Sequence, residues 1–475
     1  MCTRRWLRLN SPTIKSNHLG SSNLIRRRPT RLLNIVLSIL MENKFIAARS
    51  LGVRLPMTKK ANSSVLACVA ALWFCLSTSL SVQAGDWGRF RGPNGTGYAA
   101  AAKFPATFEV ADALWQCPVA GMGNSSPVVG GGNVYVTSAD PETSVRKLTA
   151  IDVESGKNAW SVEFPLQVFK AHKRNGFASS TPCADERHVY VLWQSATDSA
   201  IHALNHQGKK VWKYELGGFA AGPGCATSPI LHEGRLLLTH DNEKHESFLL
   251  ALDAGTGTEC WKTIRKTQRT GFSTPVIYQG KSAVTQVIFS HAYEGVVAVD
   301  FEKGEILWQN IVFGDHQQRA IGSPIVANGL VIAASGFTTG VKTLVALDPE
   351  SVDGDGQARE VYRLMRNVPH CPTPLVVGGL MFLWTDRGIL ACLEAETGLE
   401  VWAKRIGGQF FASPVCAGGI IYGVDRDGVV TTVAASREYK LLGKTELPAG
   451  SMSTPAIYDG KLIYRTTQGV IAFGK

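Results

Sequence analysis

A Ser or Thr followed by Pro and then by apolar residues recurs along most of this chain. The pair occurs eight times, at spacings of 55, 47, 46, 49, 50, 40 and 41 residues. A unit of this length is typical of one β-propeller blade, which is a single four-stranded sheet. The eight pairs are Ser126-Pro127, Thr181-Pro182, Ser228-Pro229, Thr274-Pro275, Ser323-Pro324, Thr373-Pro374, Ser413-Pro414 and Thr454-Pro455.

The pattern inside a unit predicts four short strands. In the first unit, residues 126–138 (SPVVGGGNVYVTS) place two β-branched runs around a Gly-rich turn, which is typical of a hairpin. Residues 147–152 (KLTAID) and 159–164 (AWSVEF) supply a third and a fourth strand. We therefore expect blades of four antiparallel strands.

A second motif, A-x-D-x-x-x-G-x-x-x-W, joins the third strand to the fourth. It occurs as AIDVESGKNAW at 150–160, ALDAGTGTECW at 251–261 and AVDFEKGEILW at 298–308. The Asp can accept hydrogen bonds from turn amides, the Gly supplies a positive φ, and the Trp offers a large face to the next blade. A residue repeated at one blade position indicates structure rather than catalysis. We expect blade-to-blade docking by Trp160, Trp212, Trp261, Trp308 and Trp402.

The two ends of the repeat predict how the ring closes. The eighth unit, residues 453–475, stops after three strands, and residues 113–119 (ALWQCPV) match a fourth strand that has no blade of its own. Pairing the two would complete the last blade and remove two exposed sheet edges. The predicted fold is all-β, an eight-bladed propeller over 113–475 that is closed by an N-terminal strand, with an N-terminal extension at 85–112.

The first 84 residues differ from the rest in charge. They hold 13 of the 49 Lys and Arg and one of the 38 Asp and Glu, so residues 85–475 keep 36 basic and 37 acidic residues. A general nucleic-acid binder would normally have a strongly basic domain. The near-neutral remainder therefore argues against that class.

The basic end contains a predicted export signal at 57–84. A cationic start (MTKK, 57–60) precedes an apolar run at 65–80, and SVQA (81–84) places small residues where a signal peptidase reads them. The apolar run is short of the roughly 20 residues that span a bilayer. We therefore favour cleavage after Ala84 and a periplasmic or extracellular protein over an uncleaved membrane anchor. Residues 1–56 are interpreted as an over-extended start or a disordered leader.

The repeated A-x-D-x-x-x-G-x-x-x-W strings resemble the tryptophan-docking repeats of pyrroloquinoline-quinone (PQQ) type eight-bladed propellers. Residues 86–98 (DWGRFRGPNGTGY) and 228–261 are similar to a large secreted bacterial family with PQQ-like propellers. The propeller subunit of the outer-membrane β-barrel assembly machinery is a similar scaffold. The resemblance covers essentially all of 86–475 and implies the fold, but not an activity, because one fold serves many functions.

Quinoprotein alcohol dehydrogenases of similar fold imply a quinone and a calcium ion on the propeller axis, with a disulfide between adjacent cysteines pressed against the cofactor. Seven cysteines follow Ala84, none of them adjacent, and no C-x-x-C-H haem motif is present. No catalytic base or calcium ligand of those enzymes maps onto this sequence. We expect no catalytic, cofactor-binding or metal-binding residue, with PQQ and calcium as the alternative.

Loops rich in polar and cationic residues join the fourth strand of a blade to the first strand of the next. In a meander blade these loops share one face with the loops between the second and third strands. A cluster of cations near the axis would concentrate anionic ligands, whereas the plainer interpretation is that these loops are polar because water touches them. The candidate ligand-binding residues are Arg174, Arg269, Arg319, Arg366 and His370.

Two functional classes remain. The first is an exported, non-catalytic scaffold that binds a protein, peptide or glycan at the axial face. The alternative is a periplasmic PQQ-dependent quinoprotein oxidoreductase of the alcohol dehydrogenase type. Neither class requires nucleic acid or stable membrane insertion after cleavage.

Overall fold

The computed structural model describes residues 87–474, apart from 101–103, 170, 173, 268, 314–318 and 338–339. The leader at 1–56 and the signal at 57–84 therefore lie outside the described residues. Within the described ranges, no helix has both the length and the apolar character needed to cross a bilayer.

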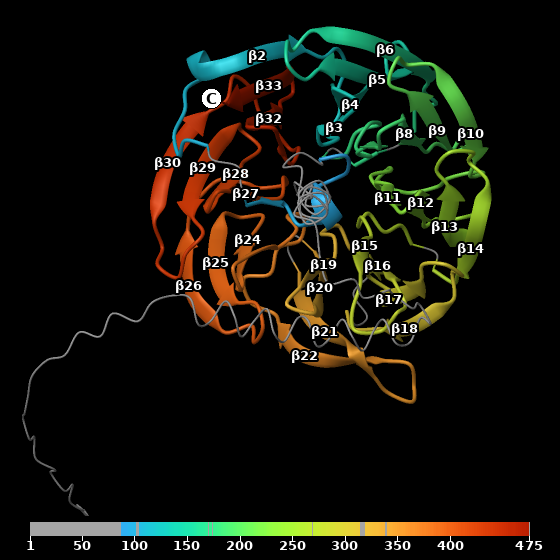
Figure 1. The fold of residues 1–475 in the computed structure, drawn as a ribbon, viewed down its shortest axis with the longest axis vertical. Coiled ribbons are helices and arrows are strands. Elements are labelled where there is room, and N and C mark those ends of the chain that lie inside the picture. The colour runs from blue at the N-terminus through green and yellow to red at the C-terminus, as the bar shows by residue number, and fades with distance from the viewer. Residues whose placement is uncertain are drawn as a thin grey trace, which may run out of the picture. The chain divides into compact units, whose positions relative to one another are not determined.

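Eight antiparallel sheets surround one axis (Figure 1), which confirms the predicted propeller. Each blade is a meander whose first strand lies innermost. Blades 1 to 4 contain β3 (Val128–Gly130), β4 (Asn133–Asp140), β5 (Val145–Asp152), β6 (Asn158–Pro165); β7 (Cys183–Ala184), β8 (His188–Trp193), β9 (Ala200–Asn205), β10 (Lys210–Glu215); β11 (Ile230–His232), β12 (Arg235–His240), β13 (Ser247–Asp253), β14 (Glu259–Arg265); and β15 (Val276–Tyr278), β16 (Gln286–His291), β17 (Gly295–Asp300), β18 (Ile306–Asn310).

The second half of the ring continues the same order. Blades 5 to 8 contain β19 (Ile325–Ala327), β20 (Leu330–Gly336), β21 (Lys342–Val352), β22 (Ala358–Leu364); β23 (Leu375–Val377), β24 (Leu380–Trp384), β25 (Ile389–Glu394), β26 (Glu400–Arg405); β27 (Val415–Ala417), β28 (Ile420–Val424), β29 (Val429–Ala434), β30 (Leu441–Glu446); and β31 (Ala456–Tyr458), β32 (Lys461–Arg465), β33 (Gly469–Gly474), β2 (Ala113–Pro118). Three short elements precede or flank β2: η1 (Pro93–Gly95), β1 (Tyr98–Ala99) and η2 (Val110–Asp112).

The N-terminal strand closes the ring as predicted. β2 pairs antiparallel with β33, with Cys117 opposite Val470, and so becomes the outer strand of blade 8. Figure 1 shows β2 and β33 side by side in that blade. The side chains of Trp115 and Cys117 are buried in the core between blades 8 and 1. Closure therefore hides apolar surface as well as two sheet edges.

The Ser/Thr-Pro pairs form a chain of hydrogen bonds around the axis. The backbone amide of Ser126 donates to the hydroxyl of Thr181 in the next blade, at 3.0 Å, and the same bond forms at five further steps. Among the described residues it is absent between Ser228 and Thr274. The last link runs from the amide of Thr454 to the hydroxyl of Ser126, at 3.1 Å, and returns to blade 1. At seven of the eight pairs a hydroxyl accepts this bond, which explains why Ser or Thr precedes Pro at those positions.

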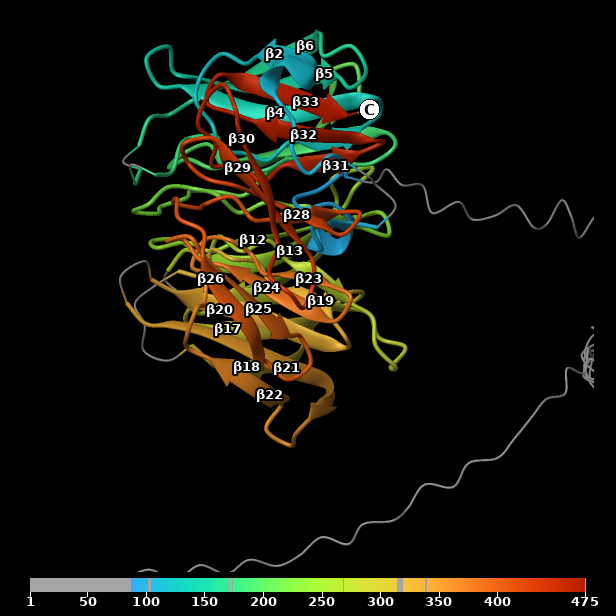
Figure 2. The same ribbon diagram turned by 90° about the vertical axis from the view of Figure 1, so that its left-hand side faces the viewer.

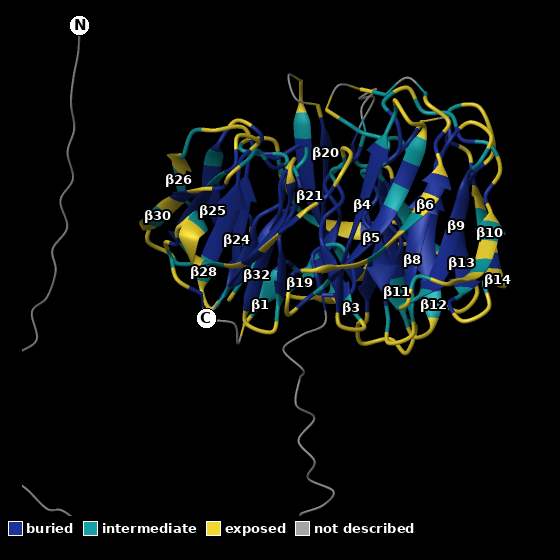
Figure 3. Cartoon of the chain, turned by 90° about the horizontal axis from the view of Figure 1, so that it is seen from above, coloured by how far each residue is buried: buried dark blue, intermediate teal, exposed yellow. Residues whose placement is uncertain are grey.

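The repeated Trp side chains lie between neighbouring blades. The indole N–H of Trp160 donates to the carbonyl of His206 at 2.8 Å, and a Cβ on Gly208 would lie 2.9 Å from the ring. Trp212, Trp261 and Trp402 also donate to a carbonyl of the following blade. Trp308 differs, because its indole donates to Gln286 within its own blade. Figure 3 shows that the inner strands are buried and that exposed residues gather on outer strands and loops.

Residues 87–99 occupy the axis at one end of the ring. The backbone of Trp87 and Gly88 accepts hydrogen bonds from Val129 and Ala184, and β1 pairs parallel with β27. Arg91 is fully buried, and its guanidinium donates to the carbonyls of Pro374 and Pro414, at 2.9 and 3.0 Å. Figures 1 and 2 show η1 at the centre of the ring, on the face where β33 ends. We call this segment the axial plug, this face the lower face and the opposite one the upper face.

Candidate ligand site on the upper face

The upper face carries the loops between the second and third strands of each blade and those that lead to the next blade. All five candidate residues belong to loops of the second kind, which follow the outer strands β6, β14, β18 and β22. Their environments differ, so each is described in turn. These residues are Arg174, Arg269, Arg319, Arg366 and His370.

Arg319 is already paired within the protein. Its guanidinium forms an ion pair with Glu243, from the β12–β13 loop, and donates to the hydroxyl of Thr270 at 3.3 Å. Burial raises the pKa of Glu243, but the Gly222 amide and Arg319 more than offset this, so its pKa lies below the ordinary value. The carboxylate is therefore ionised at neutral pH, and the charge of Arg319 is largely neutralised.

His370 is buried and does not supply a cation at neutral pH. Burial lowers the pKa of its imidazole to about 4. Its backbone amide donates to Asp386 at 2.8 Å, and Lys342 forms an ion pair with the same carboxylate at 3.3 Å. The positive charge that we expected from His370 is therefore carried by Lys342, which is already paired with Asp386. Arg269 and Arg366 are exposed, and neither side chain bonds to another described residue.

Arg174 lines a cavity of about 410 Å³ where the upper loops of blades 7, 8 and 1 meet. Its guanidinium lies over the ring of Phe411, 5.2 Å from the centroid. Arg426 lines the same cavity, donates to the side chain of Gln409 at 3.2 Å, and lies 3.4 Å from the exposed Asp427. We call this cavity, with Ser451, Met452 and Thr467 as its other lining residues, the upper-face pocket.

A third cation lies next to this pocket. Arg465 at the end of β32 is buried, and its guanidinium donates to the hydroxyl of Ser125 at 2.6 Å. Its own carbonyl accepts a hydrogen bond from the pocket residue Ser451. Burial lowers the pKa of Arg465 to about 9, so the group stays charged at neutral pH. No carboxylate of the described chain pairs with it, so the region carries more positive than negative charge.

Sequence reasoning missed most of the upper-face pocket. Residues 425–428 (DRDG) indicate a turn. Nothing in that pattern shows that Arg426 would line the same cavity as Arg174, which is distant in the sequence. Phe411 carries no local signal either. Arg174 was found because its loop is cationic.

The metal-ligating residue types and the cysteines bear on the quinoprotein alternative. In the part of the chain that the structure describes, no three His, Cys, Asp or Glu side chains gather in a way that could hold a metal ion. The seven cysteines after Ala84 are all unpaired, and five are buried.

The blades and their interlocking define this protein as an eight-bladed propeller of the PQQ-repeat class. A family model described as outer membrane protein assembly factor BamB matches residues 149–352 and 343–473, which is more than half of the chain. The chain belongs to this family, which confirms the resemblance found in the repeats.

Individual relatives are distant. BamB of Yersinia pestis is 21% identical over 329 residues, covering 68% of this chain and 67% of the relative. BamB of Moranella endobia is 22% identical over 240 residues, and the match spans 46% of this chain and 58% of that protein.

Solved structures share the fold. A europium-containing methanol dehydrogenase superposes with a TM-score of 0.61 at 13% identity, covering 82% of this chain and 91% of that one. BamB from Moraxella catarrhalis gives 0.52 at 14% identity, covering 76% and 98%. Because both a dehydrogenase and an assembly factor match at such low identity, these likenesses show the fold alone.

Proposed function

We propose that this protein is an exported, non-catalytic scaffold whose upper-face pocket holds an acidic segment of a protein partner. The observation that supports this proposal most directly is the upper-face pocket, which Arg174 and Arg426 line. Arg465 lies beside it and has no carboxylate partner among the described residues. Guanidinium groups suit bidentate capture of carboxylates. Membership of a family described as an assembly factor supports a protein rather than a small molecule as the partner.

Replacing Arg174 and Arg426 together with Gln tests this proposal. We expect a fluorescent Glu-rich peptide to bind about tenfold more weakly, since two charge-assisted contacts of roughly 0.7 kcal/mol each are lost. The matched control is R269Q/R366Q, which removes the same charge from exposed positions of the same face. Fluorescence anisotropy at low and high salt measures the affinities, and a Gln-rich peptide shows whether carboxylates are needed.

Two outcomes would overturn the proposal. If both double variants lose affinity equally, binding reflects general attraction to the face and not the pocket. If the parent fails to bind the Glu-rich peptide at low salt, the pocket does not hold acidic segments. A separate experiment tests whether the protein is non-catalytic. PQQ and calcium are added to the same protein, and an absorption spectrum and a dye-linked alcohol assay are recorded. Turnover of the alcohol would contradict a non-catalytic scaffold.

Export is tested separately. We expect exported material to begin at Gly85, because the small residues at 81–84 end the signal. N-terminal sequencing of the mature protein measures this. A chain that retains residues 65–80 would instead favour a membrane anchor.

A further inference from the structure

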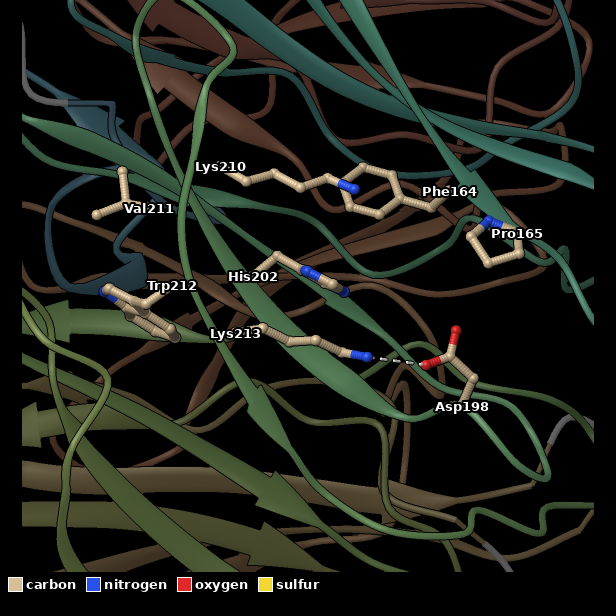
Figure 4. A pocket seen from close by; sticks show the side chains of 8 residues that line it. All are labelled: Phe164, Pro165, Asp198, His202, Lys210, Val211, Trp212 and Lys213. Atoms are coloured by element: carbon tan, nitrogen blue, oxygen red, sulfur yellow. Dashed lines mark hydrogen bonds and ion pairs between the residues drawn. The ribbon is translucent and has the colours of Figure 1, made fainter.

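A second cavity lies on the rim of the ring, between blades 1 and 2 and away from the upper-face pocket. Its volume is about 370 Å³, and Figure 4 shows the side chains that line it. β10 provides Lys210, Trp212 and Lys213, β9 provides His202, β6 provides Phe164, and the β8–β9 loop provides Asp198. We call it the rim pocket.

The rim pocket contains a histidine at a position where blades 3 and 4 have aliphatic residues. His202 precedes Ala203, which pairs with Trp212, whereas Leu250 and Val297 hold the equivalent positions in blades 3 and 4. An aliphatic side chain there completes the contact between neighbouring blades. The imidazole of His202 instead packs against the ring of Phe164, with 4.9 Å between the centroids, and borders the cavity.

The ring nitrogens of His202 have no protein partner. The residue is 8% exposed, and no described residue forms a hydrogen bond with either nitrogen. Its ring nitrogens border the cavity and are accessible to solvent or to a bound group. The side chains of His202, Lys210 and Lys213 point the same way along the rim pocket (Figure 4). The geometry leaves room for a bound group to satisfy the imidazole.

The charges around the imidazole favour an anion. Three cations act on it electrostatically: Lys213 and Lys210, which line the rim pocket, and Arg146. Asp198 is the acid that lines the rim pocket, and it is shared between Lys213 at 3.4 Å and Arg146 at 3.5 Å. Lys213 also pairs with the exposed Glu215 at 2.6 Å. Lys210 has no carboxylate partner among the described residues, and its ammonium lies 4.6 Å from the Phe164 centroid.

We propose that the rim pocket is an oxyanion site in which Lys210 and Lys213 bind a carboxylate, sulfate or phosphate group and His202 donates the third hydrogen bond. Phe164 and Trp212 form the apolar walls of the rim pocket. The site goes beyond the proposed function, because it lies on the rim between blades 1 and 2 and uses other residues.

The oxyanion must couple to the protonation of His202. Burial, then Lys213 and Lys210, lower the pKa of the free imidazole to about 4, while Asp198 opposes this and Arg146 adds to it. The ring is therefore neutral at pH 7 in the empty site. A bound anion stabilises the protonated ring and raises its pKa. By linkage, anion affinity increases as the pH falls from 7 towards the free pKa.

Sulfate is a suitable first probe, because it stays fully charged over this pH range. We expect the His202 resonance of the full chain, labelled at the imidazole carbon, to titrate about one unit higher in sodium sulfate than in sodium chloride of equal ionic strength. His188 and His206 serve as internal references, because neither lines the rim pocket. A His202→Leu variant, which carries the residue of blade 3, assigns the resonance.

The variant pair Lys210→Gln and Lys209→Gln tests the site itself. Both changes remove one charge from adjacent exposed residues, but only Lys210 lines the rim pocket. We expect K210Q to weaken sulfate binding about fivefold and K209Q to leave it within about twofold. Equal losses in the two variants, or an unchanged His202 titration in sulfate, would overturn the oxyanion site.

A capped peptide with one Glu, compared with its Gln counterpart and with sulfate, distinguishes a side-chain carboxylate from a free anion. Tighter binding of the Glu peptide than of sulfate would identify a peptide segment as the source of the oxyanion. Tighter binding of sulfate would identify a free anion.

Competition against the Glu-rich peptide of the upper-face pocket separates the two proposals. R174Q/R426Q should leave the His202 titration in sulfate unchanged, and a loss of that titration would contradict an independent site.

Discussion

Removing residues 113–118 will abolish the cooperative folding of the propeller at ambient temperature. The deletion takes away β2, exposes the β33 edge and uncovers the core that Trp115 and Cys117 complete. Truncating a buried Trp alone costs about 3–5 kcal/mol. The lost strand pairing adds to this cost. The combined loss in the free energy of unfolding is then close to the whole stability of a typical domain, which is about 5–15 kcal/mol. Thermal melting followed by circular dichroism measures the effect.

Two point variants on β2 provide the controls. Trp115→Ala should destabilise the fold by about 3–5 kcal/mol, because it empties a buried position. Leu114→Ala should melt close to the parent, because Leu114 is 45% exposed on the opposite side of the strand. A truncated chain that melts cooperatively at an unchanged temperature would disprove closure by β2.

Replacing Arg91 with Met will destabilise the ring by about 3–5 kcal/mol. The change keeps an unbranched side chain but removes the donors to the carbonyls of Gly95, Pro374 and Pro414. Each buried acceptor left without a donor costs about 1–3 kcal/mol, partly offset because a charged group no longer has to be buried. Equilibrium unfolding in urea should show a lower midpoint.

Arg366→Met is the matched control for the axial plug. Arg366 is exposed on the upper face and bonds to no described side chain, so its replacement should change stability by less than about 0.5 kcal/mol. If R91M unfolds at the same urea concentration as R366M, the axial plug does not stabilise the blades. A drop confined to R91M would show that the N-terminal segment locks blades 6 and 7 through their inner strands.

The cationic loops show which features of the candidate site a local sequence pattern can predict. Arg174, Arg319 and His370 all lie in the expected upper-face loops, yet one lines a pocket, one is ion-paired and one is buried and neutral. The residues that decide these differences are distant in sequence. Glu243 is 76 residues from Arg319, and no motif links the two.

The amino-acid sequence by itself determined the number of blades, the four-stranded meander and the closure by residues 113–119. These features follow from local signals, because alternating apolar residues, turn glycines and the Ser/Thr-Pro pair act within one unit or between neighbouring units. Only the tertiary structure decided which charges remain free, how Arg91 links blades 6 and 7, and why His202 has no hydrogen-bond partner among the described residues. Those properties depend on side chains from different blades that meet only when the ring closes, since burial and electrostatic pairing are set by neighbours in space.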